Sequence, residues 1–362
     1  MSGELIAFRA DASPRIGGGH VMRCLTLADE LRAGGARTLF LCRPGPGDLV
    51  DAIAARGHEV RPLAPADPGV APEPGDPPHA AWGGAPWRRD AEETAAAIGA
   101  AGAAWLVVDH YAFDARHAAA ARAAARRIMA IDDLDDRPLG ADLLLDQSRL
   151  PRMGPRRHEA PRALIGPRHA LLRPDFADWR GAALARRATP DAPPRILIST
   201  GLMDVGGAAA AAAAALAELD VALEIAVGAA APSAAALERL AADAPNIALR
   251  LDARNMAELM ARADLAVGAV GASTWERFCL GLPSVVFILA DNQRAIAEAL
   301  QADGLARVLG RPEACGPEPL RRAVGALLAD PAALAEQSRR GAALCDGAGA
   351  ARAAAAMREV GA

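Results

Sequence analysis

Short apolar runs alternate with longer amphipathic stretches along the whole chain. In the longer stretches the apolar residues recur at helical spacing, whereas each short run is the length of a strand. This alternation is typical of βαβ units that build a parallel sheet. The strands predicted in the first half cover residues 5–8, 38–42, 106–109, 128–131 and 143–145, and those in the second half cover residues 195–199, 223–227, 247–251, 265–267 and 285–289.

A charged, proline-bearing segment separates the two sets of strands and predicts a domain boundary. We expect an N-terminal Rossmann-like domain over residues 1–180, a linker over residues 181–194 and a C-terminal Rossmann-like domain over residues 195–362. The fold class is therefore α/β, with two doubly wound domains facing a cleft. Ligands of such sheets bind beyond the carboxyl ends of the strands, so polar residues that follow a strand are the first candidates for a site.

Length and composition narrow the class of protein. The 362 residues, 52% of them hydrophobic, suffice for two ordinary domains. A net charge of -4 gives no reason to expect a nucleic-acid partner, because binding to a phosphate backbone needs a clustered positive surface. No apolar run reaches the roughly 18 residues of a membrane span, and the first residues lack a signal peptide, so we predict a cytoplasmic protein with no membrane partner.

Cysteine and lysine usage exclude several kinds of chemistry. The five cysteines are widely spaced and form no C-x-x-C pair, so neither a disulfide framework nor a zinc site is predicted. All 40 basic residues are arginine. The absence of lysine removes a Walker-A phosphate site, a Schiff base and a Tyr-x-x-x-Lys oxidoreductase pair.

The strongest candidate for chemistry is a glycine loop between the first strand and the first helix. Gly17, Gly18 and Gly19 allow the backbone to approach a ligand closely, and His20 follows them at the helix N-terminus. The positive end of the helix dipole disfavours imidazolium there and keeps the ring able to accept a proton. We predict His20 as a general base, with Asp11 orienting the imidazole. A histidine that caps or packs at the helix start fits the spacing equally well.

Two polar clusters in the second half are candidates for binding a nucleotide and a sugar. Ser273 and Thr274 open a helix, where they suit a diphosphate, and Glu276 suits ribose hydroxyls. The alternative is an ordinary helix cap with an acid in the first turn. The second cluster is Asp291, Asn292 and Gln293. Its carboxylate and amides suit the hydroxyl and N-acetyl groups of a sugar, and the alternative is an ordinary helix N-cap.

An acidic run after another strand invites a metal interpretation. Residues 132–136 hold four aspartates, and clustered carboxylates bind magnesium. No second ligand cluster with a recognisable spacing accompanies them, and aspartates at strand ends commonly cap turns. We therefore predict no metal and no cofactor.

Taken together, several segments resemble one family of enzymes. Residues 9–23, 109–111, 131–134, 170–176 and 273–293 are similar, in the same order, to the UDP-2,4-diacetamido-2,4,6-trideoxy-β-L-altropyranose hydrolases of pseudaminic acid biosynthesis. That family in turn resembles the GT-B glycosyltransferases, in which the second domain holds most of the nucleotide. The resemblance therefore implies a GT-B-like fold and a UDP-sugar substrate.

The resemblance also implies a reaction. It is metal-independent, inverting hydrolysis at the anomeric C–O bond, which releases UDP and free 2,4-diacetamido-2,4,6-trideoxy-L-altrose. Apart from the resemblance, we expect the protein to be a monomer or a weak homo-oligomer. His20 is the general base, and Tyr111 positions the water. The substrate-binding residues expected are Arg9, Gly17, Gly18, Gly19, Arg173, Ser273, Thr274, Glu276, Asp291, Asn292 and Gln293.

One loop departs from the family pattern. Where the family has a Gly-Gly-Ser-Asp-like turn, this chain reads Thr-Gly-Leu-Met-Asp at residues 200–204. Leu202 and Met203 are bulkier, so we expect a different diphosphate geometry at this loop. Two alternatives stay open: a GT-B glycosyltransferase with a UDP-sugar donor and an alcohol acceptor, and a nucleotide-sugar-binding protein without catalysis.

Overall fold

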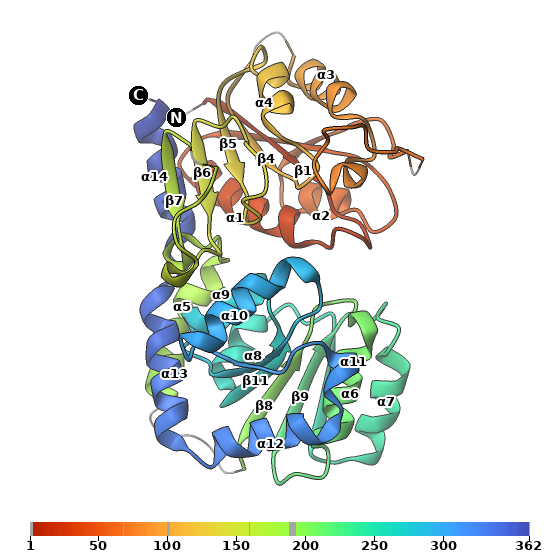
Figure 1. The fold of residues 1–362 in the computed structure, drawn as a ribbon, viewed down its shortest axis with the longest axis vertical. Helices are drawn as coiled ribbons and strands as arrows, with labels where there is room; N and C mark the ends of the chain where they lie inside the picture. Colours follow the sequence, from red (N-terminus) through yellow and green to blue (C-terminus); the bar gives the residue numbers. More distant parts are fainter. Residues whose placement is uncertain (1–2, 68, 100–101, 159, 188–192, 362) are drawn as a thin grey trace. The chain divides into compact units, whose positions relative to one another are not determined.

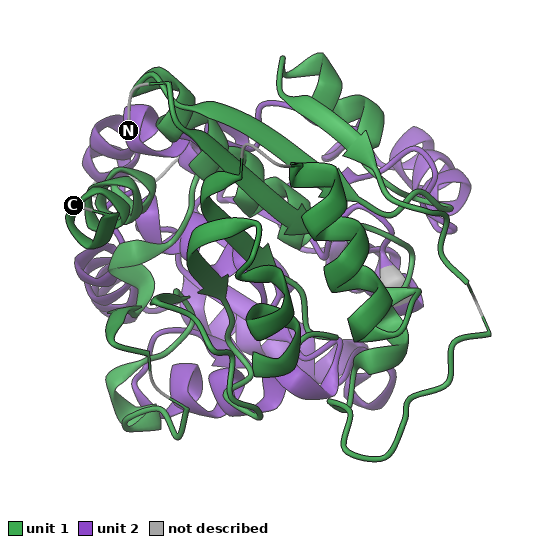
Figure 2. Ribbon diagram, turned by 90° about the horizontal axis from the view of Figure 1, so that it is seen from above, with its two compact units in different colours: residues 1–172, 348–362 green, residues 173–347 purple. Residues whose placement is uncertain are grey.

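The computed structural model describes residues 3–67, 69–99, 102–158, 160–187 and 193–361. These residues form two compact units, drawn in different colours in Figure 2. The first unit contains Met1–Leu172 and Ala348–Ala362, and the second contains Arg173–Gly347. In the described part of the chain, no helix is long and apolar enough to cross a membrane.

The first unit is a parallel seven-stranded sheet with the strand order β3-β2-β1-β4-β5-β6-β7 (Figure 1). Its strands are β1 (Leu5–Ala10), β2 (Arg37–Cys42), β3 (Glu59–Pro62), β4 (Ala103–Asp109), β5 (Ala125–Ile131), β6 (Leu143–Asp146) and β7 (Arg162–Ile165). Its helices are α1 (Gly19–Ala33), α2 (Val50–Ala55), η1 (Ala80–Gly83), α3 (Trp87–Ile98), α4 (Ala115–Ala121), η2 (Pro151–Met153), η3 (Pro167–His169) and α14 (Gly349–Gly361).

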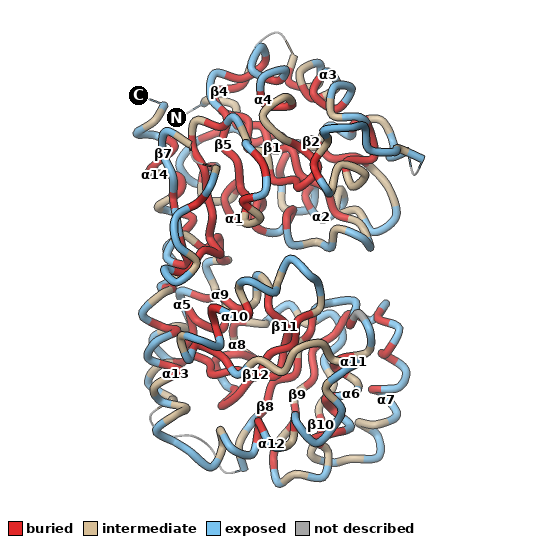
Figure 3. Tube along the Cα trace, viewed as in Figure 1, coloured by how far each residue is buried: buried red, intermediate tan, exposed pale blue. Residues whose placement is uncertain are grey.

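Alternating side chains of β1 explain the two helical layers of this unit. Ile6 and Phe8 pack with apolar residues of α1 and α14. Ala7 points to the opposite face, where it packs with Ile98 of α3 and Ala121 of α4. Both faces of β1 are therefore covered, as expected for a central parallel strand. Figure 3 shows the same pattern as largely buried strands β1, β4 and β5.

The second unit repeats this plan with six parallel strands in the order β10-β9-β8-β11-β12-β13. Its strands are β8 (Arg195–Ser199), β9 (Ala222–Val227), β10 (Ile247–Leu251), β11 (Leu265–Ala269), β12 (Ser284–Phe287) and β13 (Arg307–Val308). Its helices are α5 (Pro174–Arg186), η4 (Val205–Gly207), α6 (Ala208–Leu216), α7 (Ala234–Asp243), α8 (Met256–Arg262), α9 (Ala272–Cys279), η5 (Asp291–Gln293), α10 (Arg294–Ala302), α11 (Pro312–Cys315), α12 (Pro317–Leu328) and α13 (Pro331–Leu344).

The predicted fold class of two doubly wound α/β domains is confirmed. Every strand predicted from an apolar run is present, and three further strands were missed. These are β3, β7 and β13, which lie at or near the sheet edges and are short or carry exposed residues. Edge strands need no continuous apolar run because they are not covered on all sides, so hydrophobic pattern alone does not find them.

The boundaries of the two units differ from the predicted ranges. Helix α5 runs through residues 181–186, which were assigned to the linker, and residues 188–192 of that linker lie outside the described residues. The C-terminal helix α14 belongs to the first unit. Its buried side chains Ala353, Ala354 and Met357 share a hydrophobic cluster with α1, which explains why the chain ends on the unit where it began.

Candidate functional site

In both sheets the strand order reverses between the first and the fourth strand of the unit, and ligands of doubly wound folds bind at this point. In the first unit the reversal lies between β1 and β4, where Ala10 pairs with Asp109. The residues that follow these two strands are therefore neighbours, although they are distant in sequence. This register brings the glycine loop after β1 to the end of β4.

The glycine loop shapes a tight turn into α1. Gly17 has a φ of 76°, a conformation that favours glycine, and its amide donates to the Ser13 carbonyl at 2.7 Å. The Ser13 hydroxyl accepts from the Ile16 amide at 3.1 Å. Helix α1 begins at Gly19, so His20 lies in its first turn, and its side chain is only 8% exposed.

Asp109 at the end of β4 is the carboxylate that contacts His20. Its Oδ1 lies 2.5 Å from His20 Nδ1, and Arg23 donates to both of its oxygens. Burial opposes ionisation of Asp109, but Arg23 and His20 outweigh it, and the pKa of Asp109 lies below its ordinary range. Because an ionised carboxylate only accepts, Nδ1 carries the proton in this contact and Nε2 is the acceptor of a neutral His20 ring.

Asp11, the residue predicted to orient His20, is engaged elsewhere. Its Oδ1 accepts from Arg9 Nη1 at 2.6 Å and from the Arg43 amide at 2.7 Å, and its Oδ2 lies 3.4 Å from His110 Nε2. Asp11 was predicted for this role because it is near His20 in the chain. The pairing of β1 with β4 instead places Asp109 beside the imidazole, so the carboxylate that contacts His20 is Asp109 and not Asp11.

Arg9, predicted as a substrate contact, lies beneath this site. Its side chain is fully buried, and its Nε and Nη2 donate to Asp90 at 3.0 and 2.7 Å. With Asp11 on its other side, the guanidinium is held between two carboxylates. Its donors are thus used inside the unit, where they stabilise the end of β1.

Tyr111 contacts His20 edge-on, with ring centroids 4.6 Å apart. Its hydroxyl donates to Asp133 Oδ1 at 2.5 Å, and burial together with Asp133 raises its pKa well above the ordinary value. The phenol therefore stays protonated and acts as a donor. This proximity to His20 agrees with the role predicted for Tyr111 in positioning a nucleophile, which stays a prediction.

Two aromatic residues near this site were missed by the sequence analysis. His79 and Trp82, next to and within η1, have ring centroids 5.7 and 5.9 Å from that of Tyr111. They come from the long loop that follows β3, in which no periodicity points to a function. The only signal was two aromatic residues in a segment otherwise rich in proline, glycine and alanine.

The aspartates after β5 are used one by one rather than as a cluster. Asp132 pairs with Arg156 at 2.8 Å and Arg137 at 3.1 Å, and Asp135 accepts from backbone amides. Asp133 accepts from Tyr111. Among the described residues, no group of three metal-ligating side chains is found.

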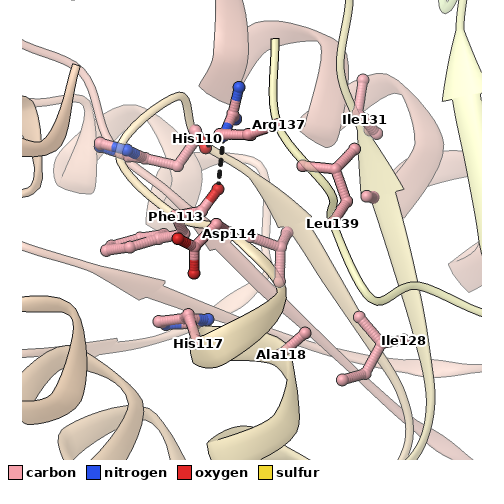
Figure 4. A pocket seen from close by; sticks show the side chains of 11 residues that line it. His110, Phe113, Asp114, His117, Ala118, Ile128, Ile131, Arg137 and Leu139 are labelled. Carbon is pink, nitrogen blue, oxygen red and sulfur yellow. Dashed lines mark hydrogen bonds between the residues drawn. The ribbon is translucent and has the colours of Figure 1, made fainter. Parts of the chain in front are cut away.

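A small cavity is lined by Val108 of β4 and by residues that follow this strand (Figure 4). Its lining includes His110, Phe113, His117 and Arg137, and Arg137 Nε donates to the Phe113 carbonyl at 2.7 Å. Its volume of about 10 Å³ is that of a single water molecule, far below the size of a sugar pocket. This cavity is therefore not a substrate site.

In the second unit the reversal lies between β8 and β11, and α9 begins just after β11. Thr274 is fully buried in the first turn of α9, and its Oγ1 accepts from the Gly271 amide at 3.3 Å. Ser273 beside it is half-buried. Glu276 is half-buried too, and burial raises its pKa despite the nearby cations Arg173 and Arg277.

Of the second polar cluster, one residue lies at the start of α9. Gln293 Nε2 lies 3.9 Å from where a Cβ on Gly271 would stand, and its Oε1 accepts from the Leu289 amide at 2.8 Å. Asp291 and Asn292 are exposed, and Asp291 pairs with Arg311 at 2.7 Å. The structure thus brings Gln293 close to Gly271, which precedes α9, whereas Asp291 pairs with the partly exposed Arg311.

Arg173, also predicted to bind substrate, precedes α5. Its guanidinium lies over the Phe176 ring at 5.3 Å, and its Nε is 3.6 Å from Asp175. Its charge acts on Glu276, which lowers the pKa of that carboxyl against the effect of burial. Arg173 therefore belongs to the surroundings of Glu276 within the second unit.

The loop after β8 is closed by its own aspartate. Asp204 Oδ1 accepts from Thr200 Oγ1 at 2.8 Å and from the Ala209 amide at 2.7 Å. The start of α6 is therefore occupied by a carboxylate, which repels an anion. Leu202 and Met203 are 66% and 45% exposed and leave this contact undisturbed. The effect of Leu202 and Met203 on phosphate binding at this loop stays a prediction.

Part of the second unit is similar in sequence to a known family of domains. Residues 208–354 match the model of the glycosyltransferase family 28 C-terminal domain. No curated protein matches the sequence at a significant level. The matched region spans most of the second unit, including α9 and η5.

Solved structures of glycosyltransferases match the whole chain in fold. The glycotransferase of kitacinnamycin has a TM-score of 0.71 at 20% identity, covering 99% of this chain and 100% of its own. The calicheamicin glycosyltransferase CalG4 has a TM-score of 0.69 at 20% identity, covering 99% and 98%. The Streptomyces sp. SF2575 glycosyltransferase SsfS6, solved with thymidine diphosphate, has a TM-score of 0.65 at 17% identity, covering 99% of each chain.

These matches are to transferases, and none of them points to a sugar-nucleotide hydrolase of pseudaminic acid biosynthesis. The chain is thus a protein with the two-domain GT-B fold whose second half is similar to the C-terminal domain of glycosyltransferase family 28.

Proposed function

We propose that this protein transfers a glycosyl group from a nucleoside diphosphate sugar to an oxygen nucleophile, with His20 as the general base. The observation that carries the proposal is the contact of His20 Nδ1 with Asp109 at the strand-order reversal of the first sheet. This contact leaves Nε2 to accept a proton, and Nε2 forms no hydrogen bond within the described residues. A base held by a buried carboxylate is the arrangement that proton abstraction requires.

The proposed reaction is a single displacement at the anomeric carbon. The nucleophile's oxygen attacks C1 of the sugar as its proton passes to His20 Nε2. The bond from C1 to the diphosphate oxygen breaks, and its electron pair leaves with the nucleoside diphosphate. The configuration at C1 is therefore inverted. A positioned base contributes about 10²- to 10⁴-fold to such a rate.

The nucleoside diphosphate is assigned to the second unit. Support comes from the family 28 match over this region and from the thymidine diphosphate bound to a transferase of the same fold. Ser273 and Thr274 at the start of α9 suit the phosphates, and Glu276 suits ribose hydroxyls. We propose UDP as the nucleotide, following the motif resemblance of residues 273–293.

The acceptor we propose first is an alcohol, because the family model and the solved structures of this fold are transferases. A second candidate is water, which would make the protein a hydrolase of a UDP-linked diacetamido-trideoxy-hexose. Two observations favour it: the motifs around His20, and the small exposed fraction of the His20 side chain, 8%. A small nucleophile reaches such a base more easily than a bulky alcohol does.

One experiment separates these candidates. The protein is incubated with a UDP-sugar, without and with a set of alcohol acceptors, and UDP and sugar products are followed by NMR. UDP release only in the presence of an alcohol supports transfer, whereas UDP with free sugar in its absence supports hydrolysis. Binding of the UDP-sugar without any product supports a non-catalytic binding protein and overturns the proposal.

A chelator arm tests the prediction that no metal is needed. We expect the rate to be unchanged in chelator, because the aspartates after β5 are engaged with arginines, backbone amides and Tyr111. Loss of activity that returns with a divalent cation would contradict this prediction. Cytoplasmic location and a monomer or weak homo-oligomer also stay predictions.

A further inference from the structure

Helix α9 carries a buried arginine, Arg277. The side chain of Arg277 is almost completely buried, and no acidic group within ion-pair distance of it is found among the described residues. Its Nη1 donates to Ser273 Oγ at 3.1 Å, and its Nη2 donates to Thr274 Oγ1 at 3.1 Å and to the Ala269 carbonyl at 3.0 Å. Its buried Nε has no hydrogen-bond partner.

This charge is costly where it lies. A buried cation normally needs an ion pair, because its removal from water carries a large free-energy cost. Burial lowers the pKa of Arg277 to about 10, and Glu276 only partly offsets this effect. The guanidinium therefore remains charged at neutral pH. The missing partner is an anion, and the N-terminus of α9, to which Arg277 points, attracts anions as well.

The hydrogen bonds of Arg277 also decide how two hydroxyls behave. A hydroxyl has one proton to donate and two lone pairs. Thr274 Oγ1 receives protons from both Arg277 and the Gly271 amide, and Ser273 Oγ receives one from Arg277. Both hydroxyls must direct their own protons elsewhere. Thr274 is fully buried, whereas Ser273 is half-buried, so Ser273 is the hydroxyl that reaches a ligand.

We infer that Arg277 is a positioning residue for the diphosphate of the nucleotide sugar: it fixes the Ser273 hydroxyl as a donor and supplies the counter-charge behind it. This inference rests on the proposed function. It adds Arg277 to the proposed binding site and states which of the two hydroxyls contacts the diphosphate. The positive charge at this site comes from the helix and one buried arginine. Of the two hydroxyls, Ser273 makes the contact and Thr274 supports it.

The test compares ligands that differ only in their phosphates. UDP, UMP, uridine and inorganic pyrophosphate are titrated calorimetrically into the full-length wild-type protein, Arg277→Met and Arg277→Lys. Because charge-assisted hydrogen bonds are strong, Arg277→Met should lower the affinity for UDP about 10- to 100-fold. Uridine binding should stay within about twofold, and Arg277→Lys should restore part of the UDP affinity, because it keeps the charge and loses the planar fork.

A matched control is Arg262→Met, which removes an exposed arginine of α8 that pairs with Glu258. It should leave the ratio of UDP to uridine affinity unchanged. A loss of UDP and uridine binding in equal proportion in Arg277→Met would show a merely structural role and overturn the inference. An unchanged UDP affinity in folded Arg277→Met would overturn it as well.

Ser273→Ala keeps the test decisive if Arg277→Met does not fold. It should weaken UDP at least about threefold and leave uridine unchanged, since one hydrogen bond to a charged group is lost. Unchanged UDP affinity in this variant would overturn the inference. Failure of the proposed function looks different: the wild-type protein would then bind neither UDP nor thymidine diphosphate.

Discussion

The two strand-order reversals of this protein are equivalent in topology and opposite in charge balance. At the first, after β1 and β4, each buried charge has a partner: Asp109 contacts Arg23 and His20, and Arg9 lies between Asp11 and Asp90. At the second, after β8 and β11, Arg277 has no ion pair within the part of the chain described. The same fold therefore carries one complete and one incomplete electrostatic arrangement.

This difference indicates two kinds of site. A complete network holds its side chains in place before any ligand arrives, which is what a catalytic base needs. In an incomplete network, the unpaired charge gains a partner only when a ligand of opposite charge binds. We therefore assign catalysis to the first unit and anion binding to the second, and the following variants test that division.

The largest expected effect comes from removing the base. His20→Asn should lower the turnover number about 10²- to 10⁴-fold while UDP binding, measured by calorimetry, stays within about twofold. The reason is that the imidazole acts on the nucleophile in the first unit, and the nucleotide is assigned to the second. His158→Asn, in the loop after η2, is the matched control and should retain turnover. Full turnover in His20→Asn would end the assignment of catalysis to the first unit.

The next effect distinguishes the two aspartates near His20. Asp109→Asn removes the negative charge that pairs with the buried Arg23 and leaves a single acceptor oxygen for Arg23 and the Nδ1 proton to share. We therefore expect a fall in both turnover and stability, the latter by about 3 kcal/mol. Asp11→Asn should also lower stability, because Arg9 loses a partner, but should reduce turnover much less. Urea unfolding and initial rates measure the two effects. An equal loss of turnover in both variants would contradict the assignment of Asp109.

A smaller effect, with a definite pH dependence, is expected at Glu276. Burial raises the pKa of this carboxyl in the folded state above its ordinary value. Protonation of Glu276 therefore favours folding. Its contribution to the free energy of unfolding is fully present below the ordinary pKa and is lost as the pH rises through the raised pKa of the folded state. Glu276→Gln does not titrate, so its stability relative to wild type should increase over that interval.

Urea unfolding of wild type and Glu276→Gln between pH 4 and pH 8, spanning the ordinary pKa of about 4.3, measures this difference. The same variant should bind UDP about tenfold more weakly at neutral pH, because the ionised carboxylate is the better acceptor for ribose hydroxyls. If the stability of Glu276→Gln relative to wild type fell as pH rises, the sign of the pKa shift would be wrong.

The smallest effect is expected at the loop after β8. The double variant Leu202→Ser, Met203→Ser should change stability by no more than about 0.5 kcal/mol and leave UDP affinity unchanged, since both side chains are exposed. Asp204→Ala should cost about 1 kcal/mol, because two amides of α6 lose their acceptor. A marked rise in UDP affinity in the double variant would show that Leu202 and Met203 obstruct the diphosphate after all.

Features that depend on local pattern could be predicted from the amino-acid sequence alone. Alternating apolar runs and amphipathic stretches predicted the two α/β domains, because burial on both faces of a parallel strand requires such runs. Glycines before His20, and hydroxyl residues before Glu276, marked two strand-to-helix turns. These groups are close in the chain, so spacing was sufficient to find them.

Contacts between groups that are distant in the chain depend on the tertiary structure. Asp109 is 89 positions from His20, and the pairing of β1 with β4, rather than any local spacing, brings the two together. The same holds for α14, which packs on α1 at the other end of the chain. Arg277 was within reach in sequence, one residue after Glu276, but its burial without a counter-charge depends on everything packed around it. Hydrophobic pattern fixes where strands and helices form, whereas charge balance is a property of the assembled fold.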